Sequence, residues 1–163
     1  MINLITKYSI ILKIFMVIFL LSNCSSTSSN KEITQLSDTE IYSKGLDAVK
    51  KGNFNKATLE FDDVFLNYPF SSLASKSEIM SAYSLYQNNE ITKAVTKLNS
   101  YIEMNPKGEL SEYAHYLLAM CYYAKVSSEN RDPEASIKSL NFFKLIITKF
   151  PNTKYAKDAK LKI

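Results

Sequence analysis

The sequence is poor in residues that make tight turns, metal sites and disulfide frameworks. Its 163 residues include three glycines, four prolines, two cysteines, one histidine and no tryptophan. So few glycines and prolines argue against an all-β fold, which needs many turns. His115 has no cysteine or second histidine at zinc-ligand spacing. No glycine-rich phosphate loop occurs either. The sequence therefore predicts a protein that is not an enzyme and needs no metal or dissociable cofactor.

An excess of charge of one sign is also lacking. The formal net charge is +4, from 20 basic and 16 acidic residues. Lys7 and Lys13 precede every acidic residue, so without residues 1–23 the balance is 18 basic against 16 acidic residues. A near-neutral chain without a basic stripe gives no electrostatic basis for binding nucleic acid.

Residues 1–23 are predicted to be a secretory signal peptide. Lys7 and Lys13 supply positive charge, and an uninterrupted apolar run extends from Ile14 to Leu21. The alternative is a single membrane anchor. A run of eight residues is too short for it, because a helix that spans a bilayer needs about 20 apolar residues.

The signal peptide ends in a motif that resembles the lipobox of bacterial lipoproteins, Leu21-Ser22-Asn23-Cys24. Asn23 departs from the usual small residue before the cysteine. The resemblance implies that Cys24 becomes the N-terminus and carries a covalent lipid, S-diacylglycerol and an N-acyl chain. Ser25 follows in place of the aspartate that retains lipoproteins at the inner membrane, which implies anchoring to the periplasmic face of the outer membrane. Residues 24–36 are predicted to be a serine-rich flexible tether.

From residue 37 onward the pattern is helix, turn, helix, and a proline closes each pair. The expected helices span about 37–51 and 53–67, 73–87 and 90–103, 110–125 and 133–149, followed by the start of another. Ser37 and Glu40 are spaced as a capping box, whereas Gly52-Asn53 and Asn88-Asn89 are expected turns. A polar insertion is expected at 126–132.

The three helix pairs resemble tetratricopeptide repeats. Each helix of a pair carries a small residue, and a large residue follows four positions after the small residue of the second helix. The matching residues are Gly45, Ala57 and Phe61; Ala82, Ala94 and Leu98; and Ala119, Ser139 and Phe143. The small residues let two helices approach closely. The predicted fold is an all-α superhelix over 37–163, with repeats at about 37–69, 70–106 and 107–151 and a partial repeat at 152–163. Since 152–163 lacks a covering helix, further repeats are expected.

Several local motifs carry a closer resemblance. Tyr68-Pro69-Phe70-Ser71, the closing Phe150-Pro151-Asn152-Thr153 and the insertion before Pro133 look like the N-terminal portion of the BamD family (ComL/YfiO type). These are repeat lipoproteins of the machinery that assembles β-barrel proteins in Gram-negative outer membranes. The resemblance implies a scaffold whose partners are the β-barrel core subunit, accessory lipoproteins and unfolded outer-membrane protein segments. The alternatives are a Tol-associated periplasmic coordinator, which usually has a coiled coil and no lipobox, and a generic lipoprotein adaptor.

The first helices of tetratricopeptide repeats line a concave surface, and this predicts a binding groove. Its expected residues are Tyr42, Leu46, Val49, Lys76, Ile79, Tyr83, Tyr86, Tyr113, Tyr116, Met120 and Tyr123. Six are tyrosines, which offer apolar area and a hydroxyl at low entropic cost. The alternative is that these side chains only pack between neighbouring helices.

Three further positions receive structural interpretations. Cys121 is expected to be a small buried side chain, since a lipidated Cys24 cannot pair with it. His115 is expected to be a packed helix residue. Asp62 and Asp63 are expected to be solvated, because adjacent helical residues point about 100° apart and cannot act as an acid–base pair.

Overall fold

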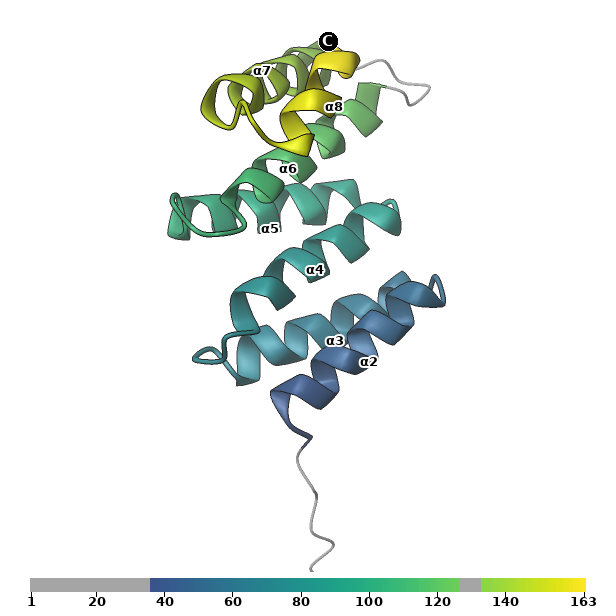
Figure 1. The fold of residues 1–163 in the computed structure, drawn as a ribbon. Coiled ribbons are helices and arrows are strands. Elements are labelled where there is room, and N and C mark those ends of the chain that lie inside the picture. Colours follow the sequence, from purple (N-terminus) through teal and green to yellow (C-terminus); the bar gives the residue numbers. More distant parts are fainter. Residues whose placement is uncertain (1–35, 127–132) are drawn as a thin grey trace, which may run out of the picture. The chain divides into compact units, whose positions relative to one another are not determined.

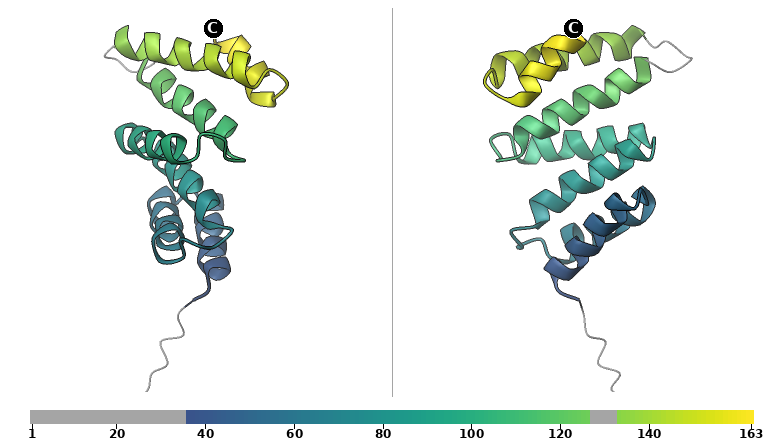
Figure 2. Two further views of the ribbon diagram at one scale, coloured as in Figure 1. Left: turned by 90° about the vertical axis from the view of Figure 1, so that its left-hand side faces the viewer. Right: turned by 45° about the vertical axis from the view of Figure 1, so that its right-hand side comes forward.

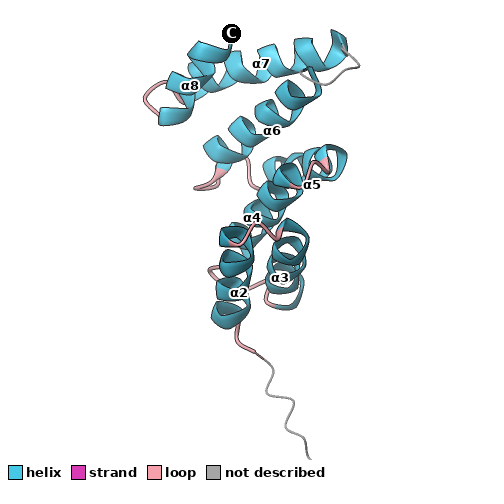
Figure 3. Cartoon of the chain, turned by 90° about the vertical axis from the view of Figure 1, so that its right-hand side faces the viewer, coloured by secondary structure: helices cyan, strands magenta, loops and turns pink. Residues whose placement is uncertain are grey.

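The computed structural model describes residues 36–126 and 133–163, and these residues form an all-α fold (Figure 3). The described part contains seven helices joined by short turns (Figure 1). Their bounds are α2 (Asp38–Lys50), α3 (Phe54–Asn67), α4 (Ala74–Gln87), α5 (Ile91–Met104), α6 (Ser111–Val126), α7 (Pro133–Lys149) and α8 (Lys154–Lys162). The predicted fold class is therefore confirmed. The predicted signal peptide, Cys24, nearly all of the predicted tether and most of the expected insertion lie outside the described residues.

Local sequence explains where the helices begin and end. The Ser37 backbone N–H donates to Glu40 Oε2 at 2.8 Å, and Ser37 Oγ accepts from the Glu40 backbone at 3.3 Å, which completes the predicted capping box. Gly52 takes φ of 70° and Asn89 takes φ of 61° in the two predicted turns. Glycine and asparagine tolerate this left-handed conformation better than other residues, so these positions reverse the chain at low cost.

The helices pack as consecutive pairs. α2 packs on α3, α4 on α5 and α6 on α7, while α3 packs on α4 and α5 on α6 to join one pair to the next. α8 covers part of α7 and also touches α6, as the views in Figure 2 show. This arrangement corresponds to the predicted three pairs followed by the first helix of a fourth.

The repeat's small residues lie where helices approach most closely. A Cβ added at Gly45 would stand 2.6 Å from the Phe61 ring, so only glycine fits there without movement. Ala57, Ala82, Ala94 and Ala119 are all fully buried. In the third pair the Ser139 hydroxyl donates to the Ala119 carbonyl oxygen at 3.5 Å. The predicted role of these residues in helix packing is confirmed.

The apolar core consists of three clusters distributed along the helix stack. Cys121 lies in the cluster formed by α4, α5 and α6 and is fully buried, as predicted. Burial raises the pKa of its thiol to about 12, so the thiol stays protonated and unreactive. Within the residues that the structure describes, no helix has the length and apolar character to cross a membrane.

Candidate interaction surface

Four of the six predicted groove tyrosines gather at one place. Tyr83 and Tyr86 from α4 lie near Tyr113 and Tyr116 from α6, close enough to contribute to the raised pKa values of Tyr86, Tyr113 and Tyr116. Tyr155 of α8 completes the group. Its ring centroid lies 5.4 Å from that of Tyr113 and 4.9 Å from that of Tyr116. We call these five residues the tyrosine cluster.

The environment of the tyrosine cluster raises the pKa of three of its hydroxyls, those of Tyr86, Tyr113 and Tyr116. Burial is the main cause that raises the pKa of Tyr113 and of Tyr116, and the hydrogen bond to Asp158 adds to it for Tyr116. Burial also raises the pKa of Tyr86. Neutral phenol groups both donate and accept hydrogen bonds, so the cluster suits polar backbone or side-chain groups next to apolar ones.

Some hydroxyls of the cluster already have partners within the chain. Tyr116 donates to Asp158 Oδ2 at 2.6 Å, whereas Tyr83 accepts from Gln87 Nε2 at 2.6 Å. Tyr116 thus fixes α8 against α6. Among the described residues, the Tyr83 hydroxyl is hydrogen-bonded only to an exposed side chain one turn away on its own helix, although its ring packs against the core of α4, α5 and α6. Tyr116 therefore fits the interpretation as a packing residue, whereas Tyr83 is better placed to bind a ligand.

The remaining predicted groove residues do not join this cluster. Ile79 is only 2% exposed and belongs to the core, so its side chain is not accessible to a ligand. The sequence pattern places Ile79 in the groove on the assumption that α4 is a helix with one buried face. In the structure α4 is buried around more of its circumference. Tyr42, Leu46 and Val49 pack on the cluster around Phe61, and the Tyr42 and Phe61 ring centroids are 5.4 Å apart.

Three more groove residues lie on α4 and α6 outside the tyrosine cluster. Met120 packs against the cluster around Phe143 and Ile146. Tyr123 is partly exposed and meets the Phe143 ring edge-on at a centroid distance of 6.0 Å. Lys76 is exposed on α4. The structure thus assembles a surface around four of the predicted tyrosines together with Tyr155, rather than one continuous groove along every first helix.

His115 is a packed helix residue, as expected. It is buried against the Phe150 ring at a centroid distance of 5.9 Å, and neither ring nitrogen has a hydrogen-bond partner among the residues that the structure describes. Burial lowers its pKa, and the charge of Lys149 acts in the same direction. In the described part of the chain, no group of three or more histidine, cysteine or acidic residues is placed to hold a metal ion.

Asp62 and Asp63 are both expected from the sequence to be solvated, and this expectation does not describe Asp62 fully. Asp63 does point toward solvent-exposed Asn67, from whose amide it accepts a hydrogen bond. Asp62, however, is half-buried and forms an ion pair with Lys97, with Nζ and Oδ1 2.8 Å apart. Asp62 and Lys97 are 35 residues apart, close to one repeat length. That spacing is the signal by which the pairing could have been found.

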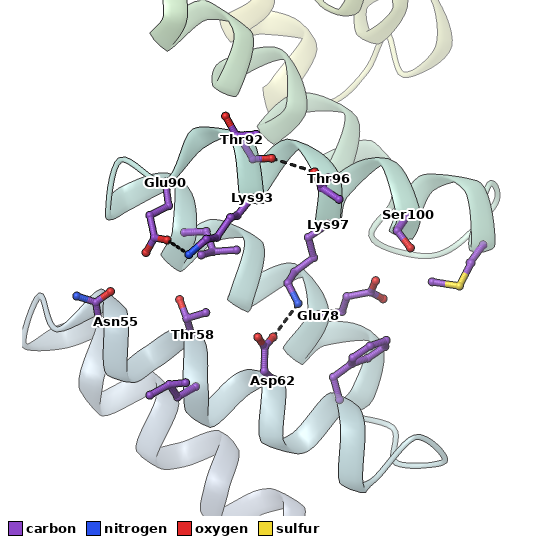
Figure 4. Close-up of a pocket in the computed structure, with 14 residues that line it drawn as sticks. Asn55, Thr58, Asp62, Glu78, Glu90, Thr92, Lys93, Thr96, Lys97 and Ser100 are labelled. Carbon is purple, nitrogen blue, oxygen red and sulfur yellow. Dashed lines mark hydrogen bonds and ion pairs between the residues drawn. The ribbon is translucent and has the colours of Figure 1, made fainter.

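The ion pair lies in a cavity that sequence analysis missed. Residues of α3, α4 and α5, with Glu90 just before α5, line a cavity of about 750 Å³ (Figure 4). No single helix carries a motif for it, because each helix contributes only part of the lining.

Comparison with known proteins places this architecture in a family. The family model described as "YfiO: Outer membrane lipoprotein" matches residues 34–163. A protein named outer membrane protein assembly factor BamD from Rickettsia prowazekii (strain Madrid E) is 36% identical over 143 residues, which are 88% of this chain and 57% of that protein. The protein of the same name from Caulobacter vibrioides is 34% identical over 123 residues, which are 76% of this chain and 40% of that protein. The Neisseria meningitidis serogroup B protein of that name is 27% identical over 153 residues, 85% of this chain and 57% of that protein.

The chain spans about half the length of the curated relatives that it matches. Neither the family description nor the relatives' names denote an enzyme, in agreement with the sequence-based prediction. Because the family model matches most of the chain and covers all seven helices of the described part, the chain belongs to the YfiO family of outer membrane lipoproteins.

Proposed function

We propose that this protein is a lipid-anchored, non-enzymatic scaffold that helps to assemble β-barrel proteins in the outer membrane. Residues 1–23 would direct export, Cys24 would carry the lipid, and residues 24–36 would tether the helical domain of 37–163 at the periplasmic face. The proposal is supported by the lipobox-like motif and by relatives that are named as outer membrane protein assembly factors.

The tyrosine cluster is the surface proposed to bind segments of unfolded outer-membrane proteins or partner subunits. It combines apolar ring surface with neutral hydroxyls, and it lies across α4, α6 and α8 rather than on one helix. A peptide rich in aromatic residues would find both apolar area and hydrogen-bond partners there. This observation carries the proposal. The β-barrel core subunit and accessory lipoproteins are proposed partners of the complete assembly.

The test is peptide binding by Tyr83→Ala in the full chain purified in detergent. The ligand is a synthetic peptide from the C-terminus of an outer-membrane β-barrel protein, and titration calorimetry measures its affinity. We expect Tyr83→Ala to weaken binding by about tenfold or more, since one aromatic anchor contributes about 2 kcal/mol. Tyr116→Ala is a poorer test than the sequence suggests, because it would also release α8 from Asp158.

Leu66→Ala is the matched control. Leu66 is 69% exposed on α3 and belongs to neither the tyrosine cluster nor the cavity. Its loss should leave affinity unchanged, and circular dichroism should show wild-type helical content in both variants. Equal peptide affinity in Tyr83→Ala and wild type would refute binding at the tyrosine cluster, whereas loss of helix would assign Tyr83 to the core.

A further inference from the structure

The cavity between α3, α4 and α5 combines four large apolar side chains with polar and charged ones. Leu59 of α3 is 72% exposed and Met104 of α5 is 59% exposed at its edges, while Phe65 and Leu85 lie deeper. Large apolar side chains left this exposed around a concavity indicate a contact surface rather than a solvated face.

Both lysines that line the cavity are already paired. Lys97 forms the ion pair with Asp62 and also stands 5.9 Å from the centroid of the Phe65 ring. Lys93 is ion-paired with Glu90, which in addition accepts a hydrogen bond from Asn88 Nδ2 at 2.7 Å. The Asp62 and Glu90 carboxylates therefore have their counter-ions within the chain.

Glu78 of α4 differs from these two carboxylates. Its side chain lines the cavity and is only 4% exposed, yet it has no hydrogen bond or ion pair with any described residue. Figure 4 shows it beside Lys97 and Asp62, on the third helix of the site. Burial raises its pKa, and the charge of Lys97 opposes that shift without forming a contact pair. A buried carboxylate without a partner is costly, and a cation that enters the cavity would remove that cost.

We propose that this cavity binds a lysine or arginine side chain of a partner polypeptide, with its charged head at Glu78 and its aliphatic stem along Leu59, Phe65 and Met104. The cavity lining holds three carboxylates, Asp62, Glu78 and Glu90, against the two ammonium groups of Lys93 and Lys97. An added cation balances these charges. The Phe65 ring, whose centroid lies 5.9 Å from the Lys97 ammonium, offers apolar surface to the aliphatic stem of the entering side chain.

A side chain of a polypeptide fits this site better than a metal ion does. Calcium and magnesium require several oxygen ligands around one point, and no such grouping occurs in the described part of the chain. A long cationic side chain instead matches apolar walls that end at a single unpartnered carboxylate. This site is separate from the tyrosine cluster and does not rest on the function proposed for it.

The test compares two synthetic peptides that are identical except for one residue between two leucines, arginine in one and citrulline in the other. Citrulline keeps the shape of arginine and removes its charge. With the full wild-type chain in detergent, titration calorimetry should show about tenfold tighter binding of the arginine peptide. Glu78→Gln should abolish this preference while circular dichroism stays unchanged, because glutamine preserves the buried shape.

Glu103→Gln is the matched control, since it removes the same charge from an exposed position of α5 outside the cavity. It should keep the preference for arginine, and so should Tyr83→Ala, which separates this site from the tyrosine cluster. Equal binding of the two peptides to the wild type, or an arginine preference that survives in Glu78→Gln, would overturn the proposal. If Glu78→Gln loses helix, Leu59→Ala at the exposed rim provides the second variant. It should weaken both peptides alike, and unchanged affinity there would also count against the site.

Discussion

The Tyr116 hydroxyl donates a hydrogen bond to Asp158 Oδ2 at 2.6 Å and thereby joins α6 to α8 across 42 residues of sequence. Asp158 also lies 3.6 Å from Lys162 Nζ, so its carboxylate is held from two sides. Tyr116→Phe should lower the free energy of unfolding by about 1 kcal/mol, less than is usual for a bond to a charged group because Asp158 is partly exposed. Urea denaturation measures the loss. Tyr42→Phe is the control, as no described residue hydrogen-bonds to that hydroxyl.

Hydrogen exchange offers a second measurement of the same bond. α8 is the helix that Tyr116 holds, so its amides should exchange faster in Tyr116→Phe while those of α3 keep their protection. Uniformly faster exchange in both helices would contradict this local role.

Gly45 of α2 faces the Phe61 ring of α3, and we expect Gly45→Ala to destabilise the protein by about 1–3 kcal/mol. The added Cβ would stand 2.6 Å from the Phe61 ring, and this clash outweighs the helix propensity that alanine gains, about 1 kcal/mol. Thermal denaturation gives the result. Gly52→Asn serves as the comparison, because Gly52 has no atom within 4 Å of an added Cβ and asparagine tolerates its φ of 70°. A Gly45→Ala variant as stable as wild type would show that Phe61 can move aside.

His115 should make the protein less stable in mildly acidic solution. Its folded-state pKa is lowered from the ordinary value of 6.5, first by burial and then by the charge of Lys149. The unfolded chain therefore takes up a proton at a higher pH than the folded chain does. Stability is full above the unfolded pKa and falls as pH drops below it toward the folded pKa. Carboxylates titrate in the same region, so the informative quantity is the difference from a variant.

The variant is His115→Leu, which keeps an apolar contact with Phe150 and removes the titrating group. Chemical denaturation at about pH 7.5 and about pH 5 should show a smaller loss of stability in the variant than in the wild type. Equal losses in both proteins would mean that His115 protonates as readily in the folded state as in the unfolded chain.

Cys24 is expected to anchor the protein through its lipid. Cys24→Ala should move the protein from the membrane fraction to the soluble fraction after a salt wash, because several acyl chains contribute about 0.8 kcal/mol for each buried CH₂. Cys121→Ala is the matched control and should stay with the membrane, since Cys121 is buried in the core. A Cys24→Ala protein that remains wholly membrane-bound would refute the lipid anchor.

Sequence reasoning succeeded where local chemistry decides the structure. Ser37, Gly52 and Asn89 mark helix ends or turns through their own backbone and side-chain preferences, and all three act as expected. The repeat pattern also identified Phe61 and its glycine partner, because a 34-residue repeat fixes which positions face each other. These features depend on neighbours in sequence or on a known repeat geometry.

The details of the two candidate sites depend on how successive repeats stack, and no single repeat contains that information. Ile79 is an example of what repeat position alone does not predict. Its position in the repeat places it toward the groove, but the neighbouring helices bury it. Glu78 precedes Ile79, and the sequence alone suggests an ordinary carboxylate on a helix surface. The packing of α3 and α5 against α4 is what places it in the cavity. Comparing side chains one repeat length apart would have revealed the Asp62–Lys97 pair and the bond from Asn88 to Asn55, which are 35 and 33 residues apart.

The packing of each helix mainly on its neighbours in sequence has a consequence for how the chain folds. Contacts of short sequence separation form quickly, since little chain entropy is lost before they are made. Phe61 can close on Gly45 as soon as residues 38–67 are free, and α4 then extends and stabilises that first pair. A chain that crosses a membrane with its N-terminus leading can therefore fold vectorially, each arriving helix docking on the one before it while the rest is still in transit.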